Sequence, residues 1–398
     1  MSIATKLAAD PTSVEAQNAF FPWLRERREN APVSLDPETG HWSVFRYDDC
    51  VRVMNDPHTF SNDLTDLTPP QEDYDLFLKG NLATMDEPRH RRMRLLVSRA
   101  FTPRFIASLK PRMIQIAAGI LDGLDGTDEF DVVPTLASSL PLTVICELLG
   151  VPMEDRETFR EWAHVIHDNG GESVEQMLVV APAVRAMNGY LRSLIRQRRA
   201  HPREDLVTKM VSAEHEGRRL EEDEIIGFIG LLLIAGHLTT TAMITNIPSL
   251  FDSRPDLWTQ LRADRDLVKG TIEEIVRYRP SFTRFVRRTL AESEIGGQRI
   301  PAGDLLNVWI ASANRDEAHF QRPDEFDIRR DPNRHLGFGQ GIHYCIGAWL
   351  ARIEGDVALN ALLDRFTRVS VQHERGVTYL DPDIMLGATV LPVRVTRP

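Results

Sequence analysis

The sequence predicts a mainly α-helical globular protein with a minor amount of β structure. Amphipathic patterns of helix length recur along the chain, strand patterns are short and lie toward the two ends, and one long segment is apolar on nearly every helix face. The chain has 398 residues, of which 42% are hydrophobic and 26% charged, so a large buried core is expected.

Helical periodicity is clearest in four segments, residues 111–124, 184–199, 256–278 and 346–366. Short strand patterns occupy residues 42–47, 294–300 and 390–395. In the second of these, Gly296-Gly297 separates two short runs and predicts a hairpin turn.

Composition excludes several classes of protein. A formal net charge of −11 argues against binding nucleic acid. Three distant cysteines, Cys50, Cys146 and Cys345, favour neither a disulfide framework nor a structural zinc site. The N-terminus lacks a basic start followed by an apolar run, and the longest apolar stretch, residues 225–236, is shorter than the ~20 residues that span a bilayer. We therefore expect a cytoplasmic protein with no membrane association.

The chain shows no flexible linker, low-complexity tract or repeat. We expect residues 1–398 to form a single domain in which residues 1–18 are flexible.

The segment 222–244 is the helix that is apolar on nearly every face, and such a helix is normally buried. It nevertheless holds Gly236, His237 and three threonines. A glycine inside a helix costs about 1 kcal/mol relative to alanine. A kink, a bulky ligand against the helix or tight helix packing would each account for Gly236, and packing is favoured when the segment is considered alone.

The most informative segment is HLGFGQGIHYCIGAWLAR, residues 335–352. Alternating glycines precede Cys345, which lies just ahead of a predicted helix. Glycines let a backbone loop approach a flat object closely, and the amide groups of a helix N-terminus favour a thiolate. A thiolate is a soft ligand that suits iron. The alternatives are a buried free cysteine in a glycine-rich turn, or a zinc site of His335, His343 and Cys345 that lacks a fourth ligand.

Residues 338–347 resemble the haem-binding signature of the cytochrome P-450 superfamily, Phe-Gly-x-Gly-x-His-x-Cys-x-Gly, in every fixed position. The resemblance implies that Cys345 is the iron ligand, that Phe338 packs near its sulfur, that His343 bonds a haem propionate, and that Gly339 and Gly347 belong to the haem-binding loop. It also implies haem b, iron protoporphyrin IX, held between a long central distal helix and the helix that follows the cysteine loop.

A Glu-x-x-Arg pair, Glu274 and Arg277, also matches the family. On residue spacing alone it is a surface ion pair that contributes a few tenths of a kcal/mol. The resemblance implies a buried structural triad instead, in which the third member is Arg330 or His335.

Further propionate-binding residues are implied by a His-x-x-x-Arg motif, His90 and Arg94, and by Arg287. At positions i and i+4 of a helix, the first two share one face. Without the resemblance, this basic run is a solvated helix end, and that interpretation is kept for Arg89, Arg91 and Arg92.

Residues 235–240 of the apolar helix, AGHLTT, resemble the family's oxygen-activating pattern Ala-Gly-x-acid-Thr-Thr. The match implies that Ala235 and Gly236 face the haem, that the helix is locally distorted, and that Thr239 is the catalytic residue that helps to deliver protons to dioxygen. Leu238 departs from the pattern because leucine cannot relay a proton. Three hypotheses follow: water and Thr239 suffice, a substrate group completes the relay, or the enzyme uses peroxide or a less demanding reaction.

The family resemblance therefore implies a soluble, monomeric haem-thiolate monooxygenase that inserts one oxygen atom from dioxygen into a small apolar organic substrate. Electrons would come from a separate ferredoxin or flavodoxin with its reductase. Rival hypotheses are a peroxide-driven haem-thiolate enzyme, a haem-binding or sensor protein without turnover, and a structural helical protein without haem.

The resemblance places the substrate pocket along residues 62–82, around Ile234 and Leu238, and along residues 282–286 and 385–389. These stretches are largely apolar. The pocket-lining candidates are Leu64, Leu67, Phe77, Ile234, Leu238, Phe282, Phe285 and Met385, while Arg284 is expected to face solvent.

Overall fold

The computed structural model describes residues 8–67, 72–124, 126–169 and 174–398. Its contacts divide the chain into two compact units that are interleaved in sequence. The first comprises the chain up to Ser61, Arg112–Leu140 and Thr239–Pro398; the second comprises Asn62–Pro111 and Pro141–Leu238. Helices dominate and the strands are short, which confirms the predicted mainly α fold with minor β structure.

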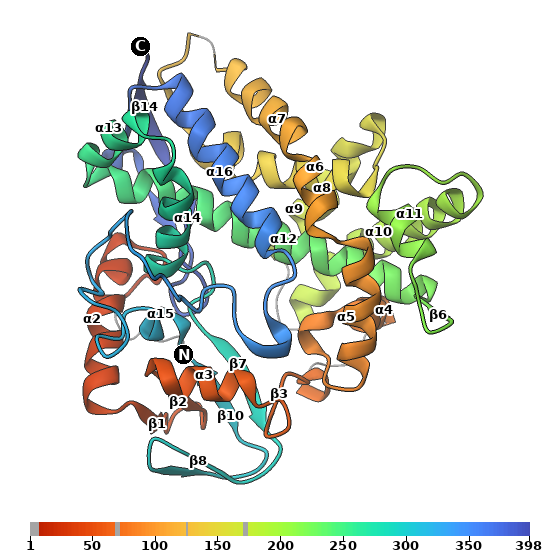
Figure 1. Cartoon of the computed structure of the whole chain (residues 1–398), viewed down its shortest axis with the longest axis horizontal. Coiled ribbons are helices and arrows are strands. Elements are labelled where there is room, and N and C mark those ends of the chain that lie inside the picture. The colour runs from red at the N-terminus through yellow and green to blue at the C-terminus, as the bar shows by residue number, and fades with distance from the viewer. Residues whose placement is uncertain (1–7, 68–71, 125, 170–173) are drawn as a thin grey trace. The chain divides into compact units, whose positions relative to one another are not determined.

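The first unit contains a five-stranded sheet in the order β1-β2-β10-β7-β3 (Figure 1). Strand β2 runs parallel to β10, with Val44 opposite Val308, and the other pairs are antiparallel. The strands are β1 (Val33–Leu35), β2 (Trp42–Val44), β3 (Phe60–Ser61), β7 (Phe285–Thr289) and β10 (Leu305–Val308).

An aromatic cluster fills the core beside this sheet. Phe45 stacks on Trp309 with ring centroids 5.7 Å apart, and Phe20 packs against the same tryptophan. Trp309 is fully buried, and its indole N–H donates to Ser43 Oγ at 3.2 Å, so its one polar group is satisfied. The cluster packs at the ends of β2 and β10, because Phe45 and Trp309 directly follow these two strands.

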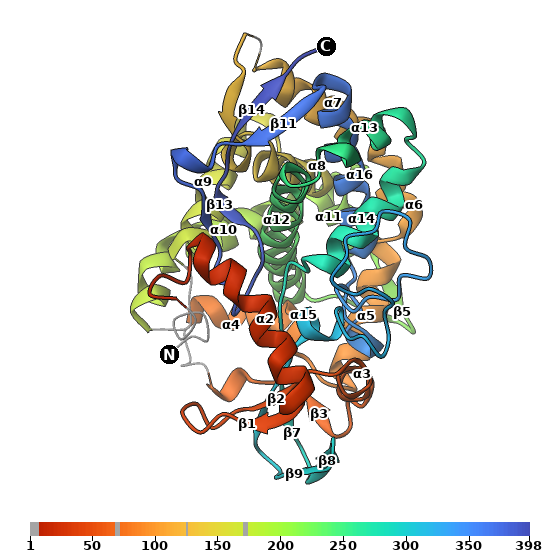
Figure 2. The same ribbon diagram turned by 90° about the vertical axis from the view of Figure 1, so that its left-hand side faces the viewer.

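The remaining elements of the first unit surround this core. Helix α2 packs against α15 (Figure 2), and α14 packs against α16 (Figure 1). The helices are α2 (Val14–Asn30), α3 (Tyr47–Asn55), α13 (Pro255–Ala263), α14 (Leu267–Tyr278), α15 (Ile310–Ala313) and α16 (Ala348–Arg365). The smaller strands are β4 (Glu129–Asp131), β8 (Ser293–Ile295), β9 (Gln298–Ile300), β11 (Arg368–Val371), β12 (Thr378–Tyr379), β13 (Ala388–Val390) and β14 (Pro392–Thr396).

The described residues of the second unit are helical apart from one short hairpin. Helix α10 packs against α9, α4 and α11, and α11 packs against α5. Its helices are α4 (Glu72–Gly80), α5 (Arg89–Ala100), α6 (Pro103–Ser108), α9 (Arg156–Asn169), α10 (Val174–Ala200) and α11 (Leu206–Ser212), and its strands are β5 (Glu214–His215) and β6 (Arg218–Arg219). The buried pair of Arg198 and Asp205 joins α10 to the N-cap of α11.

Three helices contribute residues to both units: α7 (Lys110–Asp122), α8 (Ser139–Leu149) and α12 (Glu222–Asp252). Within the described part of the chain, α12 is the one helix whose length and composition would allow it to cross a membrane. However, 67% of its most apolar 18-residue window is buried in the protein. That burial agrees with the predicted core position of an all-apolar helix.

Some predicted element boundaries were wrong. Residues 256–278 form two helices because the Asp264 side chain accepts the Asp266 N–H at 3.1 Å in a turn that interrupts the helix. The predicted strand 42–47 ends at Val44, and Tyr47 begins α3. The Gly296-Gly297 hairpin is confirmed, with both glycines at positive φ. Of the N-terminal segment expected to be flexible, residues 1–7 lie outside the described residues, and α2 begins at Val14.

Candidate active site

The cysteine loop in the first unit closes on itself before α16 begins. The Cys345 N–H donates to the Phe338 carbonyl at 2.9 Å, and the Gly339 N–H donates to the Leu336 carbonyl at 2.8 Å. Cys345 is exposed, whereas Cys50 and Cys146 are buried. Burial raises the pKa of the Cys50 thiol well above its usual range. Among these three cysteines, Cys345 is therefore the one that is not buried in the protein.

Glycine is required at different positions of this loop for different structural reasons. Gly339 and Gly341 have φ of +70° and +68°, in the left-handed region that favours glycine. A Cβ on Gly341 would lie 2.5 Å from the Met54 carbonyl oxygen of α3, so this glycine serves packing within the protein. A Cβ on Gly347 would lie 3.8 Å from Cys345 Sγ. Glycine at this position therefore leaves one side of the sulfur uncovered.

The Phe338 ring lies against an arginine side chain that is itself held by an ion pair. The Arg352 guanidinium lies 4.3 Å from the Phe338 ring centroid and donates to both carboxylate oxygens of Glu273. Burial acts to raise the pKa of Glu273, but hydrogen bonds from Arg352 and His335 outweigh it and bring the value to about 2. This ion pair joins α14 to the start of α16 and positions Arg352 against the Phe338 ring of the cysteine loop.

His335 is already engaged within the protein. Its Nε2 lies 3.2 Å from Glu273 Oε2, and its Nδ1 accepts the Gly337 N–H at 3.2 Å. Over the described residues, no group of three or more His, Cys, Asp or Glu side chains is arranged to hold a metal ion. The zinc alternative with His343 therefore has no geometric support.

The Glu274–Arg277 pair is completely buried, unlike the surface pair that its spacing alone predicts. Arg277 donates to both oxygens of Glu274 at 2.7 Å. Arg330 Nε adds contacts of 3.2 Å to the same carboxylate, so the third member is Arg330 and not His335. Arg277 also donates to the carbonyls of Asn314 and Pro323. The triad thus ties α14 to the segment that leads into the cysteine loop.

The remaining predicted residues of the first unit lie on three elements. Arg287 lies on β7 with 6% exposure, and one of its guanidinium nitrogens donates to the Val286 carbonyl at 2.8 Å. His343 ends the short 3-10 turn Gly341–His343 and is half-buried. Thr239 lies on α12, where its carbonyl accepts the Ser281 hydroxyl at 2.7 Å.

His90 and Arg94 lie in the second unit, on α5, as their spacing predicts. His90 is 2% exposed. Burial, with the neighbouring Arg94 charge as the second cause, lowers the pKa of His90 below its usual range. The solvated-face interpretation is wrong for Arg92, which pairs with the buried Glu224, and Arg89 donates to the Lys79 carbonyl at 2.9 Å.

Gly236 lies close to a side chain of α8 within the second unit. A Cβ at this position would meet the tip of Ile145 at 3.3 Å, so glycine lets α8 and α12 approach closely. Ala235 precedes it on the exposed part of the helix. Residues 222–252 form one helix, α12, and the expected local distortion of that helix stays a prediction.

Three of the predicted pocket-lining residues lie near one another in the first unit. Phe282 and Phe285 have ring centroids 6.0 Å apart, and Phe282 forms an isolated backbone bridge with Met385. Arg284 does not simply face solvent, because it pairs with Asp383 at 3.2 Å and donates to Asn307. In the second unit, a Cβ on Gly230 would meet the Phe77 ring at 3.1 Å. Part of the predicted stretch 62–82, residues 68–71, lies outside the described residues.

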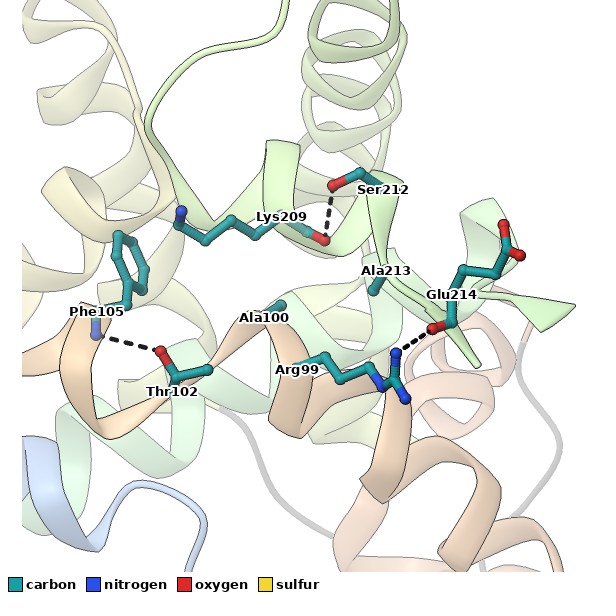
Figure 3. A pocket seen from close by; sticks show the side chains of 8 residues that line it. All are labelled: Arg99, Ala100, Thr102, Phe105, Lys209, Ser212, Ala213 and Glu214. Atoms are coloured by element: carbon teal, nitrogen blue, oxygen red, sulfur yellow. Dashed lines mark hydrogen bonds between the residues drawn. The ribbon is translucent and has the colours of Figure 1, made fainter. Parts of the chain in front are cut away.

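A surface hollow of about 470 Å³ lies at the end of α5 in the second unit (Figure 3). Lys209 lies over the Phe105 ring at 4.7 Å, and Arg99 donates to the Glu214 carbonyl at 2.8 Å. None of the predicted site residues lines this hollow, and its cationic groups contact their own neighbours.

One contact at the active-site helix was not anticipated from the sequence. Thr240 of α12 donates to Glu354 Oε2 of α16 at 3.3 Å, and both side chains are buried. A signal for this was available, because Glu354 shares a helix face with Leu350 and Ala358, both apolar and both buried.

Comparison with known proteins agrees with this geometry. The family model described as Cytochrome P450 matches residues 36–395. Cyclomarin C epoxidase CymV of Salinispora arenicola is 42% identical over 90% of this chain and 92% of its own length. Erythromycin C-12 hydroxylase of Saccharopolyspora erythraea is 37% identical over 95% of this chain and 94% of its own. The ligand-free structure of cytochrome P450 TbtJ1 superimposes with a TM-score of 0.87 at 40% identity, covering 95% of this chain and 97% of that one.

The fold and the cysteine loop define a haem-dependent oxidoreductase. The chain belongs to the cytochrome P450 family and is a monooxygenase of that family. The residues present fit the haem of this family, because an exposed thiol, a soft donor, ends a glycine-rich loop that leaves its sulfur uncovered on one side.

Proposed function

We propose that the protein is a haem b monooxygenase in which the Cys345 thiolate ligates the iron and one oxygen atom enters an apolar organic substrate. The observation that carries this proposal is the glycine-rich loop that the Cys345–Phe338 hydrogen bond closes, with the exposed residue Cys345 at its end. When bound, the haem supplies the binding and cleavage of dioxygen, with the second oxygen atom leaving as water. We further propose one P450 domain over the whole chain, which the family match over residues 36–395 supports.

The chain's own residues have distinct proposed roles toward the haem. His90, Arg94, Arg287 and His343 would hold its propionates, because they are cationic or N–H-donating groups and carboxylates accept such bonds. Ala235, Gly236, Gly339 and Gly347 would allow the backbone to approach the macrocycle, and Phe338 would shield the sulfur. Thr239 would hold a proton at its hydroxyl where oxygen is activated.

The substrate is proposed to contact an apolar surface that includes Phe282, Phe285 and Met385, which lie together. Arg284 is occupied by Asp383, so it is not offered as the partner of a substrate carboxylate. The relatives named an epoxidase and a hydroxylase support both reaction types as candidates for this chain.

Electrons are proposed to come from a separate ferredoxin or flavodoxin and its reductase, with the enzyme acting as a cytoplasmic monomer. A carrier would contact the surface around Cys345. In sequence, two exposed aromatic residues lie on either side of this cysteine, Tyr344 at 40% and Trp349 at 58% exposure. An acidic carrier would meet Arg91 and Arg104 of α5 and α6, because Arg92 is already paired.

The second candidate function is a peroxide-driven haem-thiolate enzyme, and Leu238 is the observation that favours it. The substrate for the test is a compound, found by screening, whose binding shifts the Soret band. The enzyme and this compound are incubated in two reactions. The first contains reductant, ferredoxin, reductase and labelled dioxygen, and the second contains hydrogen peroxide. Label in the product of the first reaction supports the monooxygenase. Product from peroxide alone selects the second candidate, and no turnover in either reaction supports a binding or sensor role.

A further inference from the structure

The hollow at the end of α5 carries a cationic group at each of its two ends. Figure 3 shows Lys209 beside Phe105 at one end and Arg99 at the other. All of the residues that line it belong to the second unit. Its volume of about 470 Å³ lies within the roughly 300–1,000 Å³ that small-molecule pockets occupy. The hollow is therefore large enough for a small organic ligand.

Neither cation is neutralised by a close, buried carboxylate. Arg99 donates to the Glu214 carbonyl at 2.8 Å and contacts His215 Nδ1 at 3.1 Å. A guanidinium cannot accept a hydrogen bond, so the imidazole nitrogen is the acceptor and is uncharged. Lys209 lies 3.5 Å from Glu204, whose side chain is 95% exposed, and water screens such a pair strongly. Both positive charges remain available to an anion.

The surroundings of the hollow favour an anion as well. Glu214 is the one acidic side chain among the described residues that line it, and its carboxylate already pairs with Arg219 at 2.9 Å. Residues 89–121, which include α5 and α6, contain eight Lys or Arg and no Asp or Glu, although the formal net charge of the chain is −11. A positive local field of this kind draws anionic ligands to the surface.

The end of the hollow at Lys209 also offers a neutral donor. Lys209 Nζ lies 4.7 Å from the centroid of the Phe105 ring. The Phe105 N–H donates to Thr102 Oγ at 3.2 Å, so the Thr102 hydroxyl keeps its own proton to donate. Ala100 and Ala213 are buried and add a small apolar surface to the lining. An ammonium and a hydroxyl thus lie at one end, a guanidinium at the other, and methyl groups line part of the wall.

We propose that this hollow binds an aliphatic dicarboxylate. One carboxylate would contact the Lys209 ammonium and the Thr102 hydroxyl, and the other would contact the Arg99 guanidinium, because charge-assisted hydrogen bonds to carboxylates are strong. The methylene chain would lie against Ala100 and Ala213. A compact inorganic anion would fill only a small part of the hollow. The site involves none of the residues proposed to hold the haem or the substrate, so this inference does not depend on the proposed function.

Calorimetric titration of the ferric holoenzyme at pH 7 and low salt tests the site, with succinate, adipate, suberate and sebacate as probes. We expect one saturable site for at least one of these, and binding of the monocarboxylate of the same chain length at least about tenfold weaker. Lys209→Met and Arg99→Met should each weaken binding of that probe by about tenfold. Lys269→Met is the matched control, because this exposed lysine lies on α14, and it should leave binding unchanged.

The Soret band is recorded in the same titration and should not shift, since the hollow is lined by none of the proposed haem contacts. The proposal is overturned if no probe gives saturable binding, or if Lys209→Met binds the probe as tightly as the wild type. It is also overturned if inorganic phosphate binds as tightly as the dicarboxylate, or if a Soret shift saturates with the same affinity. If Arg99→Met does not fold, because Arg99 holds the Glu214 carbonyl of β5, Lys209→Met alone decides.

Discussion

Arg277 and Glu274 form an ion pair with both side chains completely buried and with Nη2 2.7 Å from Oε1. Arg330 contacts the same carboxylate from the segment that leads into the cysteine loop. Because Arg277 also donates to the carbonyls of Asn314 and Pro323, one guanidinium organises the backbone behind the loop. A buried pair of this kind is costly to break from one side, since the remaining charge has no solvent.

Arg277→Leu is expected to destabilise the protein by about 3–5 kcal/mol, because Glu274 would lose its main partner. Urea unfolding with the haem bound measures the effect, and haem content after purification should fall as well. Arg322→Ala is the control, since that arginine is 66% exposed in its i,i+3 pair and should cost less than about 0.5 kcal/mol. Equal midpoints for Arg277→Leu and the wild type would contradict the role of the triad.

Two glycines at positive φ should respond differently to alanine. Gly341→Ala places a Cβ 2.5 Å from the Met54 carbonyl, so the cysteine loop must move and haem occupancy should fall markedly. Gly376 has φ of +82° and nothing within 4 Å of its Cβ position, so Gly376→Ala should cost only about 1–2 kcal/mol of backbone strain and keep the haem. Absorbance per mole of protein reads out occupancy. Equal occupancy in the two variants would show that the α3 contact does not position the loop.

Stability is expected to depend on pH through Glu354. Unfolded, its carboxyl ionises near the ordinary value of 4.5, whereas burial in the folded protein raises its pKa to about 8. The folded state therefore holds the extra proton between these values, and its stability falls as pH rises through that window, by about 1.4 kcal/mol per pKa unit of difference. Between pH 5 and 8, the free energy of unfolding measured in urea should fall less for Glu354→Gln than for the wild type. Parallel curves would mean that Glu354 is ionised when folded.

Leu238→Glu is expected to raise the coupling of reductant use to product, because a carboxyl beside Thr239 would add a positioned proton donor. Product and hydrogen peroxide are quantified per reductant consumed. Unchanged coupling in Leu238→Glu would show that proton supply at this helix does not limit the enzyme.

Much of the site could be predicted because its residues lie close in sequence. The cysteine loop, the His90–Arg94 spacing and the long apolar helix are local patterns, and the Gly296-Gly297 hairpin follows from turn chemistry alone. The interruption at Asp264 was missed because one side-chain hydrogen bond to the Asp266 N–H outweighs helical periodicity.

Features that depend on tertiary packing were not available from the sequence. The choice of Arg330 over His335 depends on which side chain reaches Glu274 across the fold. The apolar neighbours of Glu354 in the predicted helix indicate that this side chain is buried, but the sequence does not reveal that its partner is Thr240 of α12.

Ligation of the haem iron by Cys345 is tested most directly by the absorbance spectrum of the ferrous–carbon monoxide complex. The wild type and the control Cys146→Ala, which alters a buried cysteine, should both show the far-red-shifted Soret band of thiolate ligation, and Cys345→Ala should lose it. A wild-type protein without that band, or a Cys345→Ala variant that keeps it, would contradict the account.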